Sequence, residues 1–260
     1  MEGCRHAGGR NIARIALANE MAKHLSSLDG PPSLSIIVPV LDEAAGIVAA
    51  LQPLQELRAR GVQLIVVDGG SADGTPELAA PLADRVPSAA RGRARQMNAG
   101  AALATGRILV FLHADTRLPD AADRLIMDAL RPECGRHWGR FDVSIEGRSA
   151  WLPLVAAMMN LRSRLTGIAT GDQAMFVSRE AFDAAGGFPD IPLMEDIAIS
   201  RRLRKRAAPA CLPQKVVTSG RRWDRQGVWR TIRLMWWLRL RFFLGADPHR
   251  LAVEYGYVPR

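Results

Sequence analysis

Three short apolar segments, each followed by a helix-like segment, constrain the fold of this chain most. They are rich in β-branched residues, long enough for buried strands and too short for buried helices. The segments are 34–40 (LSIIVPV), 62–67 (VQLIVV) and 107–112 (RILVFL). Helical spacing is expected over 43–60 with a kink at Pro53, from Thr75, over 94–104, and from Pro119 to about 130. Repeated strand–helix units predict an α/β fold with a parallel sheet and helices on both faces.

The second half of the chain is less regular. Strands are expected over 138–146 and 173–177, and helices over 150–165, 179–185, 194–206 and 229–244. The domain organisation predicted from these patterns has three parts: an N-terminal extension over 1–32 with a short helix at 12–28, an α/β domain over 33–225, and a helical tail over 226–260.

Composition narrows the class of protein. Of 260 residues, 48% are hydrophobic and 23% are charged, which is typical of a globular chain and excludes a disordered or collagen-like one. No run of about 18 apolar residues occurs, so no membrane-spanning helix is expected. The three cysteines, Cys4, Cys134 and Cys211, lie far apart in the sequence and form no CxxC pair. This pattern favours a reducing cytoplasm. The net charge of +9 favours anionic partners.

Acidic residues follow three of the predicted strands directly. They are Asp42, Glu43, Asp68 and Asp115. Ligands bind beyond the carboxyl ends of strands in open α/β sheets, so we expect these carboxylates to meet at one binding edge. The alternative for Asp68 is a tight turn, in which Asp73 and Thr75 act as local caps.

Three further groups are candidates for chemistry. Asp115, after His113, suits a Mg²⁺ that keeps several waters, or it caps a nearby helix. Glu195 and Asp196 begin a predicted helix. Acidic residues there either stabilise the helix by interacting with its dipole or supply a general base. Arg91, Arg93 and Arg95 approach a helix N-terminus, an arrangement typical of an anion site or of a solvated basic surface.

The tail combines arginines with an apolar stripe. Arg230, Arg233 and Arg241 lie near one helical face, whereas Leu234 and Leu238 belong to the stripe, with Met235 and Phe242 beside them. We expect the stripe to pack on the core or on a second subunit in a homodimer. Peripheral membrane contact is the alternative.

The order of several motifs resembles family-2 glycosyltransferases. The motifs are 35–43 (SIIVPVLDE), 66–75 (VVDGGSADGT), 95–100 (RQMNAG), 111–115 (FLHAD), 186–188 (GGF) and 194–196 (MED). The resemblance covers about 33–206. It implies the GT-A fold, a Rossmann-like mixed sheet with helices on both faces. It also implies inverting transfer from a nucleotide sugar, usually assisted by Mg²⁺ or Mn²⁺.

The resemblance assigns roles residue by residue. Asp196 matches the catalytic base, with Glu195 beside it, and Asp115 matches the metal-binding Asp of a DxD motif. The nucleotide-sugar site would comprise Pro39, Asp42, Glu43, Asp68, Gly69, Arg95, His113 and Ala114. The acceptor site would comprise Arg91, Arg93, Asp172, Gln173 and Arg222. Two residues depart from the pattern: Gly69 replaces an Asp, and His113 replaces the first Asp of DxD.

With these two departures, the sequence resembles a bacterial subgroup of the family. The subgroup includes selenosugar synthases of selenoneine biosynthesis and arsenosugar-associated glycosyltransferases. The shared segments are 67–71 (VDGGS), 91–98 (RGRARQMN), 113–116 (HADT) and 171–173 (GDQ). The resemblance implies a UDP-N-acetylglucosamine or UDP-glucose donor and selenophosphate as acceptor, with a C–Se bond formed. The alternatives are transfer to a hydroxyl of a small molecule or membrane lipid, and a non-catalytic module that binds nucleotide or nucleic acid. No nucleic-acid-binding motif occurs in the sequence, so nucleic acid is not an expected partner.

Overall fold

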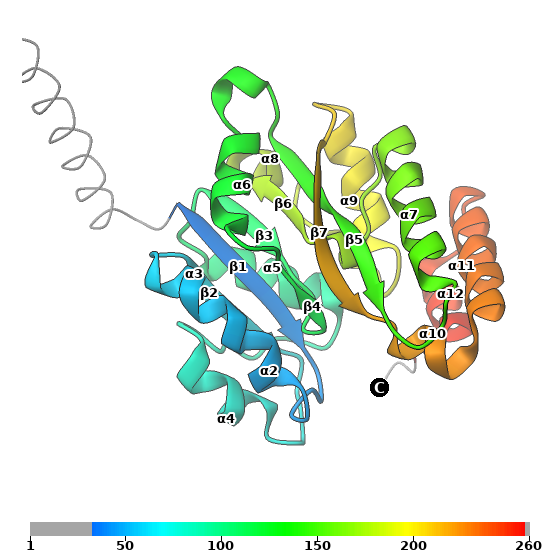
Figure 1. The fold of residues 1–260 in the computed structure, drawn as a ribbon, viewed down its shortest axis with the longest axis horizontal. Helices are drawn as coiled ribbons and strands as arrows, with labels where there is room; N and C mark the ends of the chain where they lie inside the picture. The colour runs from blue at the N-terminus through cyan, green and yellow to red at the C-terminus, as the bar shows by residue number, and fades with distance from the viewer. Residues whose placement is uncertain (1–32, 258–260) are drawn as a thin grey trace, which may run out of the picture.

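The protein is built around one mixed seven-stranded sheet (Figure 1). The structure is a computed structural model that describes residues 33–257, so the expected helix over 12–28 lies outside the described residues. The strand order is β2-β1-β3-β6-β5-β7-β4. The strands are β1 Leu34–Val40, β2 Gln63–Asp68, β3 Ile108–Phe111, β4 Thr116–Arg117, β5 Trp138–Glu146, β6 Met175–Ser178 and β7 Ala210–Ser219.

Helices cover both faces of this sheet. The α-helices are α2 Ile47–Leu51, α3 Gln55–Ala59, α4 Thr75–Ala79, α5 Arg93–Leu103, α6 Ala122–Ala129, α7 Leu152–Thr166, α8 Arg179–Ala184, α9 Glu195–Arg204, α10 Arg221–Gln226, α11 Val228–Phe243 and α12 Pro248–Tyr255. Four 3₁₀ turns are η1 Gln52–Leu54, η2 Ala80–Leu82, η3 Pro132–Cys134 and η4 Gly171–Gln173.

The first three long strands form the parallel half that the sequence predicts. β1 pairs in parallel with β2 on one side and with β3 on the other. Helix α5 lies close against them, since a Cβ at Gly100 would collide with Ile37 and Val67. The predicted helix over 43–60 is split into α2 and α3 by the 3₁₀ turn that contains Pro53, because proline cannot donate a helical hydrogen bond.

The other half of the sheet is mixed, and two of its strands, β4 and β7, were not predicted from the sequence. β6 runs antiparallel to β3 and β5, and β7 runs parallel to β5. Strand β7 was not predicted, because Pro213 and Lys215 lie in its exposed middle. The ladder with β5 shifts register between Phe141 and Asp142, and a bulge of this kind tolerates proline in a strand.

The helical tail packs against the α/β domain. Leu238 of α11 and Leu251 of α12 are completely buried and form a cluster with Leu193 and Ile197. The stripe predicted over 234–242 therefore packs on the core. Helix α12, which was not predicted, begins at Asp247, whose carboxylate accepts a hydrogen bond from the His249 N–H at 3.0 Å. None of the helices within 33–257 is long and apolar enough to cross a bilayer.

Candidate active site

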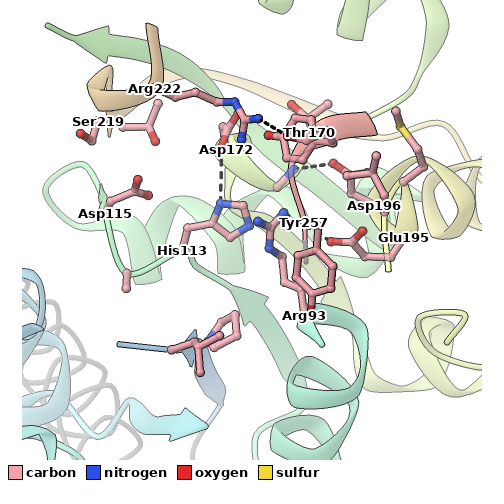
Figure 2. Close-up of a pocket in the computed structure, with 18 of the residues that line it drawn as sticks. Arg93, His113, Asp115, Thr170, Asp172, Glu195, Asp196, Ser219, Arg222 and Tyr257 are labelled. Carbon is pink, nitrogen blue, oxygen red and sulfur yellow. Dashed lines mark hydrogen bonds and ion pairs between the residues drawn. The ribbon is translucent and has the colours of Figure 1, made fainter. Parts of the chain in front are cut away.

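A cavity of about 410 Å³ opens at the edge of the sheet where β1, β3, β5 and β7 end. Its wall comes from those strand ends, the turn η4, the starts of α5 and α9, and the helices α10, α11 and α12. Figure 2 shows side chains from these separate elements converging on one space. The position agrees with the expectation that the binding site lies beyond the carboxyl ends of the parallel strands.

Two carboxylates share one cation on the β1 and β3 side of the cavity. Oδ2 of Asp115 lies 3.5 Å from Nη2 of Arg221, and Oε2 of Glu43 lies 3.6 Å from the same atom. Hard oxygen donors that converge in this way suit Mg²⁺ or Mn²⁺. Within 33–257 no group of three or more His, Cys, Asp or Glu residues is arranged to hold a metal. An ion held here would therefore take its remaining ligands from substrate and water.

His113 is turned towards a different partner. Its Nδ1 lies 3.4 Å from Oδ1 of Asp172 (Figure 2). The ring also lies directly against Gly171, where a Cβ would collide with it. Burial alone would raise the pKa of the Asp172 carboxyl, but the interaction with His113 and the nearby arginine charges outweigh burial and lower it. Asp172 is thus held as an anion facing the cavity.

Glu195 is almost completely buried at the start of α9. Its Oε1 lies 3.6 Å from Nη1 of Arg93, and only 4% of its side chain is exposed. Burial raises the pKa of the Glu195 carboxyl; the Arg93 charge opposes this shift, and the neighbouring Asp196 adds to it. The protonation of Glu195 therefore depends on a cation from a distant helix.

Asp196 is fixed by backbone groups. Its Oδ2 accepts a hydrogen bond from the Gly171 N–H at 2.9 Å, and its Oδ1 accepts one from the Ile197 N–H at 2.7 Å. The first bond ties α9 to the turn η4 (Figure 2). The carboxylate is thereby oriented at the cavity, where a base or an orienting group must be positioned.

Four arginines also line the cavity, and we call them the cationic wall: Arg91, Arg93, Arg222 and Arg239. In Arg91, Arg222 and Arg239 the Nε atom is buried and has no hydrogen-bond partner among the described residues. Arg162, just behind, has unpaired Nε and Nη2, and burial lowers its pKa. Unpaired buried donors are costly, so the wall is suited to an anionic ligand.

The tail supplies aromatic rings to this wall. The Arg222 guanidinium lies 3.6 Å above the Tyr255 ring centroid and donates from Nη2 to the Tyr255 carbonyl at 2.7 Å. Arg91 lies 5.3 Å from the ring centroid of Tyr257. These contacts hold the guanidinium planes in place by cation–π attraction.

Most residues expected at the site line this cavity. They are Pro39, Glu43, Arg91, Arg93, His113, Ala114, Asp115, Asp172, Glu195, Asp196 and Arg222. The others lie elsewhere in the structure. They are Asp42, Asp68, Gly69, Arg95 and Gln173.

Asp42 lies in the loop after β1, and Asp68 and Gly69 lie at the end of β2. Asp68 is 3% exposed, and its carboxylate accepts the N–H groups of Gly70 at 2.9 Å and Ser71 at 3.1 Å. The carboxylate of Asp42 accepts the Ala72 N–H at 3.0 Å. The Asp68 contacts are those of the tight turn that the sequence allowed as the alternative, whereas the Asp42 contact joins the loop after β1 to the loop after β2.

Arg95 and Gln173 also have structural partners. Arg95 is exposed on α5 and its Nε donates to Asp190 Oδ1 at 2.7 Å. Gln173 is completely buried; its Oε1 accepts the Thr170 N–H at 3.2 Å and its Nε2 donates to Asn160 at 3.3 Å. Gln173 thus shapes the turn that carries Gly171 and Asp172.

Several lining residues were missed from the sequence. They are Thr218 and Ser219 at the end of β7, and Met235, Arg239, Tyr255 and Tyr257 from the tail. The only signal was Arg239, which lies opposite the other tail arginines on the helix. A polar residue on the packed face of a helix needs a partner inside the fold, and here that face borders the cavity.

A curated relative and the family profile agree with this architecture. The profile described as "Glycosyl transferase family 2" matches residues 35–184. A "PGL/p-HBAD biosynthesis glycosyltransferase" of Mycobacterium bovis is 39% identical over 97 residues, which are 35% of this chain and 38% of that protein. The chain thus matches well under half the length of this relative.

Solved structures share the fold at low sequence identity. The mannosyltransferase PcManGT from Pyrobaculum calidifontis, solved with GDP-Man and Mn²⁺, covers 88% of this chain and 70% of its own, with a TM-score of 0.57 and 23% identity. Glucosyl-3-phosphoglycerate synthase from Mycobacterium tuberculosis, solved with Mn²⁺, UDP and glucosyl-3-phosphoglycerate, covers 74% and 73%, with a TM-score of 0.55 and 23% identity. The expected GT-A-like fold is confirmed. Because the profile spans more than half of the sequence, the chain belongs to glycosyl transferase family 2.

Proposed function

We propose that this protein is an inverting glycosyltransferase that moves a sugar from a UDP donor to an anionic acceptor, with selenophosphate as the favoured acceptor. The observation that carries the proposal is the cationic wall: four arginines line the same cavity as Asp115, Asp172 and Asp196, and three of them have a buried Nε without a hydrogen-bond partner among the described residues. An acceptor that arrives charged would pair with the guanidinium groups that line the cavity.

The donor end is assigned to the Asp115 side of the cavity. A divalent ion held by Asp115, with Glu43 near it, would supply charge stabilisation to the departing diphosphate. Arg221, which contacts both carboxylates, would add positive charge at the same end. The solved relatives bound to UDP or GDP-Man with Mn²⁺ support the choice of donor class.

The acceptor end is assigned to the cationic wall. Selenium of selenophosphate attacks the anomeric carbon, the C–Se bond forms, and the bond from that carbon to the diphosphate oxygen breaks with release of UDP. Hydrolysis of the Se–P bond by water then releases phosphate. Because this nucleophile is already anionic, Asp196 has only to orient it, and the arginines bind its phosphoryl oxygens in paired hydrogen bonds.

Transfer to a hydroxyl, of a small molecule or of a membrane lipid, is the second candidate. It is favoured by the Asp196 carboxylate, which is fixed at the cavity by two N–H groups and so is positioned as a base. The two candidates differ in what Asp196→Asn does. A hydroxyl acceptor needs proton removal, so its transfer is nearly abolished, whereas transfer to selenophosphate falls only modestly.

The deciding experiment is an anaerobic incubation with UDP-N-acetylglucosamine, Mg²⁺ and selenophosphate, read by mass spectrometry. A selenium isotope pattern on a hexosamine, formed together with UDP, is the expected result. UDP release without selenium incorporation would discard the acceptor and keep the glycosyltransferase. No UDP release with any nucleotide sugar, combined with nucleic-acid affinity that falls steeply with salt, would favour the non-catalytic module.

The proposed site of this reaction is the cytoplasm. Selenophosphate and free thiols both require reducing conditions, and Cys134 and Cys211, the cysteines within the described residues, are free. Unpaired cysteines are typical of reducing compartments.

A further inference from the structure

Two helices on the side of the molecule away from β2, α7 and α11 (Figure 1), carry rows of exposed apolar side chains. The α7 strip consists of Leu154, Met158, Leu161 and Leu165. The α11 strip consists of Trp229, Trp236, Leu240 and Phe243. Each of these eight side chains is between 50% and 78% exposed. Their spacing places each set on one face of its helix, and exposed apolar surfaces of this kind mark interaction sites.

The two strips meet at one end. The ring of Trp151, just before α7, lies 5.4 Å from the ring of Trp229 at the start of α11, measured between centroids. Trp151 is itself half exposed, and Trp237 and Leu244 extend the apolar surface on α11. We call this combined area, from Trp151 to Leu165 and from Trp229 to Leu244, the apolar surface.

The charges around the apolar surface are mostly positive. Helices α7 and α11 contain no Asp or Glu, and the carboxylate of Glu254 on α12 is already paired with Arg241. On α11 Arg230 is exposed beside the strip, and Arg233 is exposed within it, one turn after Trp229. The Arg201 guanidinium lies 5.7 Å from the ring centroid of Phe243 and adds a third cation at the far end. Any partner of this area must therefore be apolar in its centre and negatively charged around it.

We infer that the apolar surface docks the protein on an anionic lipid bilayer. Tryptophan is the residue most suited to the boundary between headgroups and acyl chains, and arginines at the border pair with anionic headgroups. Amphipathic helices that lie in the interface have this pattern of residues.

A second copy of the chain fits the apolar surface less well. A twofold interface would place the same patch on itself, so Arg230 and Arg233 would approach the arginines of the other copy. Neither helix offers a carboxylate to compensate them. An anionic bilayer supplies the missing negative charge. Membrane docking of this kind is independent of which sugar and which acceptor the protein uses.

Docking in this orientation has a consequence for the cavity. The inner face of α11 carries Thr231, Met235 and Arg239, which line the cavity, while its outer face carries the exposed strip. The helix would then lie between the bilayer and the cavity, and reactants would enter beside the membrane surface.

The test is co-sedimentation of the full chain with phosphatidylcholine vesicles that contain either no charged lipid or about a third phosphatidylglycerol. We expect binding to the anionic vesicles that weakens with salt. Trp236→Ser with Leu240→Ser should lower the vesicle partition coefficient about tenfold or more. Arg230→Gln with Arg233→Gln should remove the preference for phosphatidylglycerol.

Matched controls lie on the opposite side of the molecule. Val48→Ser and Leu78→Ser remove apolar side chains that are 44% and 41% exposed on α2 and α4, and they should leave vesicle binding unchanged. UDP release in solution should stay the same in every variant, because none of these residues lines the cavity.

Two results would overturn the inference. One is the absence of anionic-vesicle binding by the unmodified chain, or equal binding by the Trp236 and Leu240 double variant. The other is a concentration-dependent doubling of mass in light scattering that the same double variant abolishes, with no lipid binding, since a second copy would then be the partner.

Discussion

Two sets of carboxylates in this protein are held in opposite ways. After β1 and β2, the carboxylates of Asp42, Asp68 and Asp73 accept N–H groups from the adjoining loops. Around the cavity, Asp115 and Glu195 are instead met by arginines from elements distant in the sequence. In the first set Asp68 closes its own turn, while Asp42 and Asp73 tie the loop after β1 to the loop after β2; the second set is held by ion pairs between side chains.

We expect this difference to distinguish the acids that stabilise loops away from the cavity from Asp115 and Glu195; Asp196 lines the cavity although it also accepts two N–H groups. A carboxylate that accepts loop amides has its lone pairs engaged and stabilises the loop. A carboxylate paired with a mobile or partly exposed guanidinium can exchange that partner for a metal or a substrate cation. The following predictions test this division.

The largest effect is expected for Asp115→Asn. If Asp115 holds the divalent ion, its loss should lower kcat for UDP release by about 10²–10³-fold, and more Mg²⁺ should be needed for the remaining activity. Asp128→Asn, an exposed acid paired with Arg131 on the surface, is the control and should behave as the unmodified enzyme. A decrease of less than about threefold, with an unchanged Mg²⁺ requirement, would remove Asp115 from the metal site.

Asp68→Ala should act mainly on stability. Two loop amides would lose their acceptor at a position that is 3% exposed, which costs about 1–3 kcal/mol. Urea unfolding measures this cost, and Asp42→Ala, which removes one exposed bond, should cost less. The milder Asp68→Asn tests the uridine role: a large rise in donor KM with little loss of stability would contradict the structural assignment of Asp68.

Arg93→Gln should shift the pH dependence of activity. The Arg93 charge opposes the rise in the pKa of Glu195, so its removal should raise that pKa further. The acid limb of the kcat/KM profile should then move to higher pH if transfer requires the charged form of Glu195. Arg95→Gln, on the same helix but paired with Asp190 outside the cavity, should leave the profile in place. Equal shifts in the two variants would deny Arg93 this role.

The smallest effect is expected for Asp172→Asn. The folded state lowers the pKa of Asp172, so the contacts of its carboxylate with His113 and the nearby arginine charges contribute stability above the unfolded value of about 3.9, and this contribution is lost as pH falls through the folded value. Because 46% of the side chain is exposed, the contribution at pH 7 should be at most about 1 kcal/mol. Unfolding free energies of both proteins should converge at low pH. A constant difference down to pH values well below about 3 would exclude this linkage.

Sequence analysis predicted the parallel half of the fold well. The strand over 34–40 and its two parallel neighbours are found within one or two residues of their expected limits, because apolar β-branched runs form buried strands largely regardless of distant contacts. Strand β7 and helix α12 were missed. In β7, Pro213 and Lys215 are atypical of a strand, so the local sequence does not predict one. The strand is stabilised by its pairing with β5.

The candidate site, like the fold, was predicted in part from the sequence. Motif order placed Glu43, His113, Asp115, Glu195 and Asp196 in one region, and all five line the cavity. The sequence could not choose between Arg93 and Arg95, because both lie on one helix and only packing decides which faces α9. It also gave no cavity role to the tail, although Tyr255 and Tyr257 contribute to the wall.

The sequence by itself determined the strand–helix succession, the acidic residues at the strand ends and the excess of arginine, since each follows from local pattern or composition. The tertiary structure decided which carboxylates accept loop N–H groups and which meet distant cations. It also decided that α11 faces the cavity on one side and exposes tryptophan on the other. These properties depend on how elements far apart in the chain pack, and periodicity within one segment does not encode that packing.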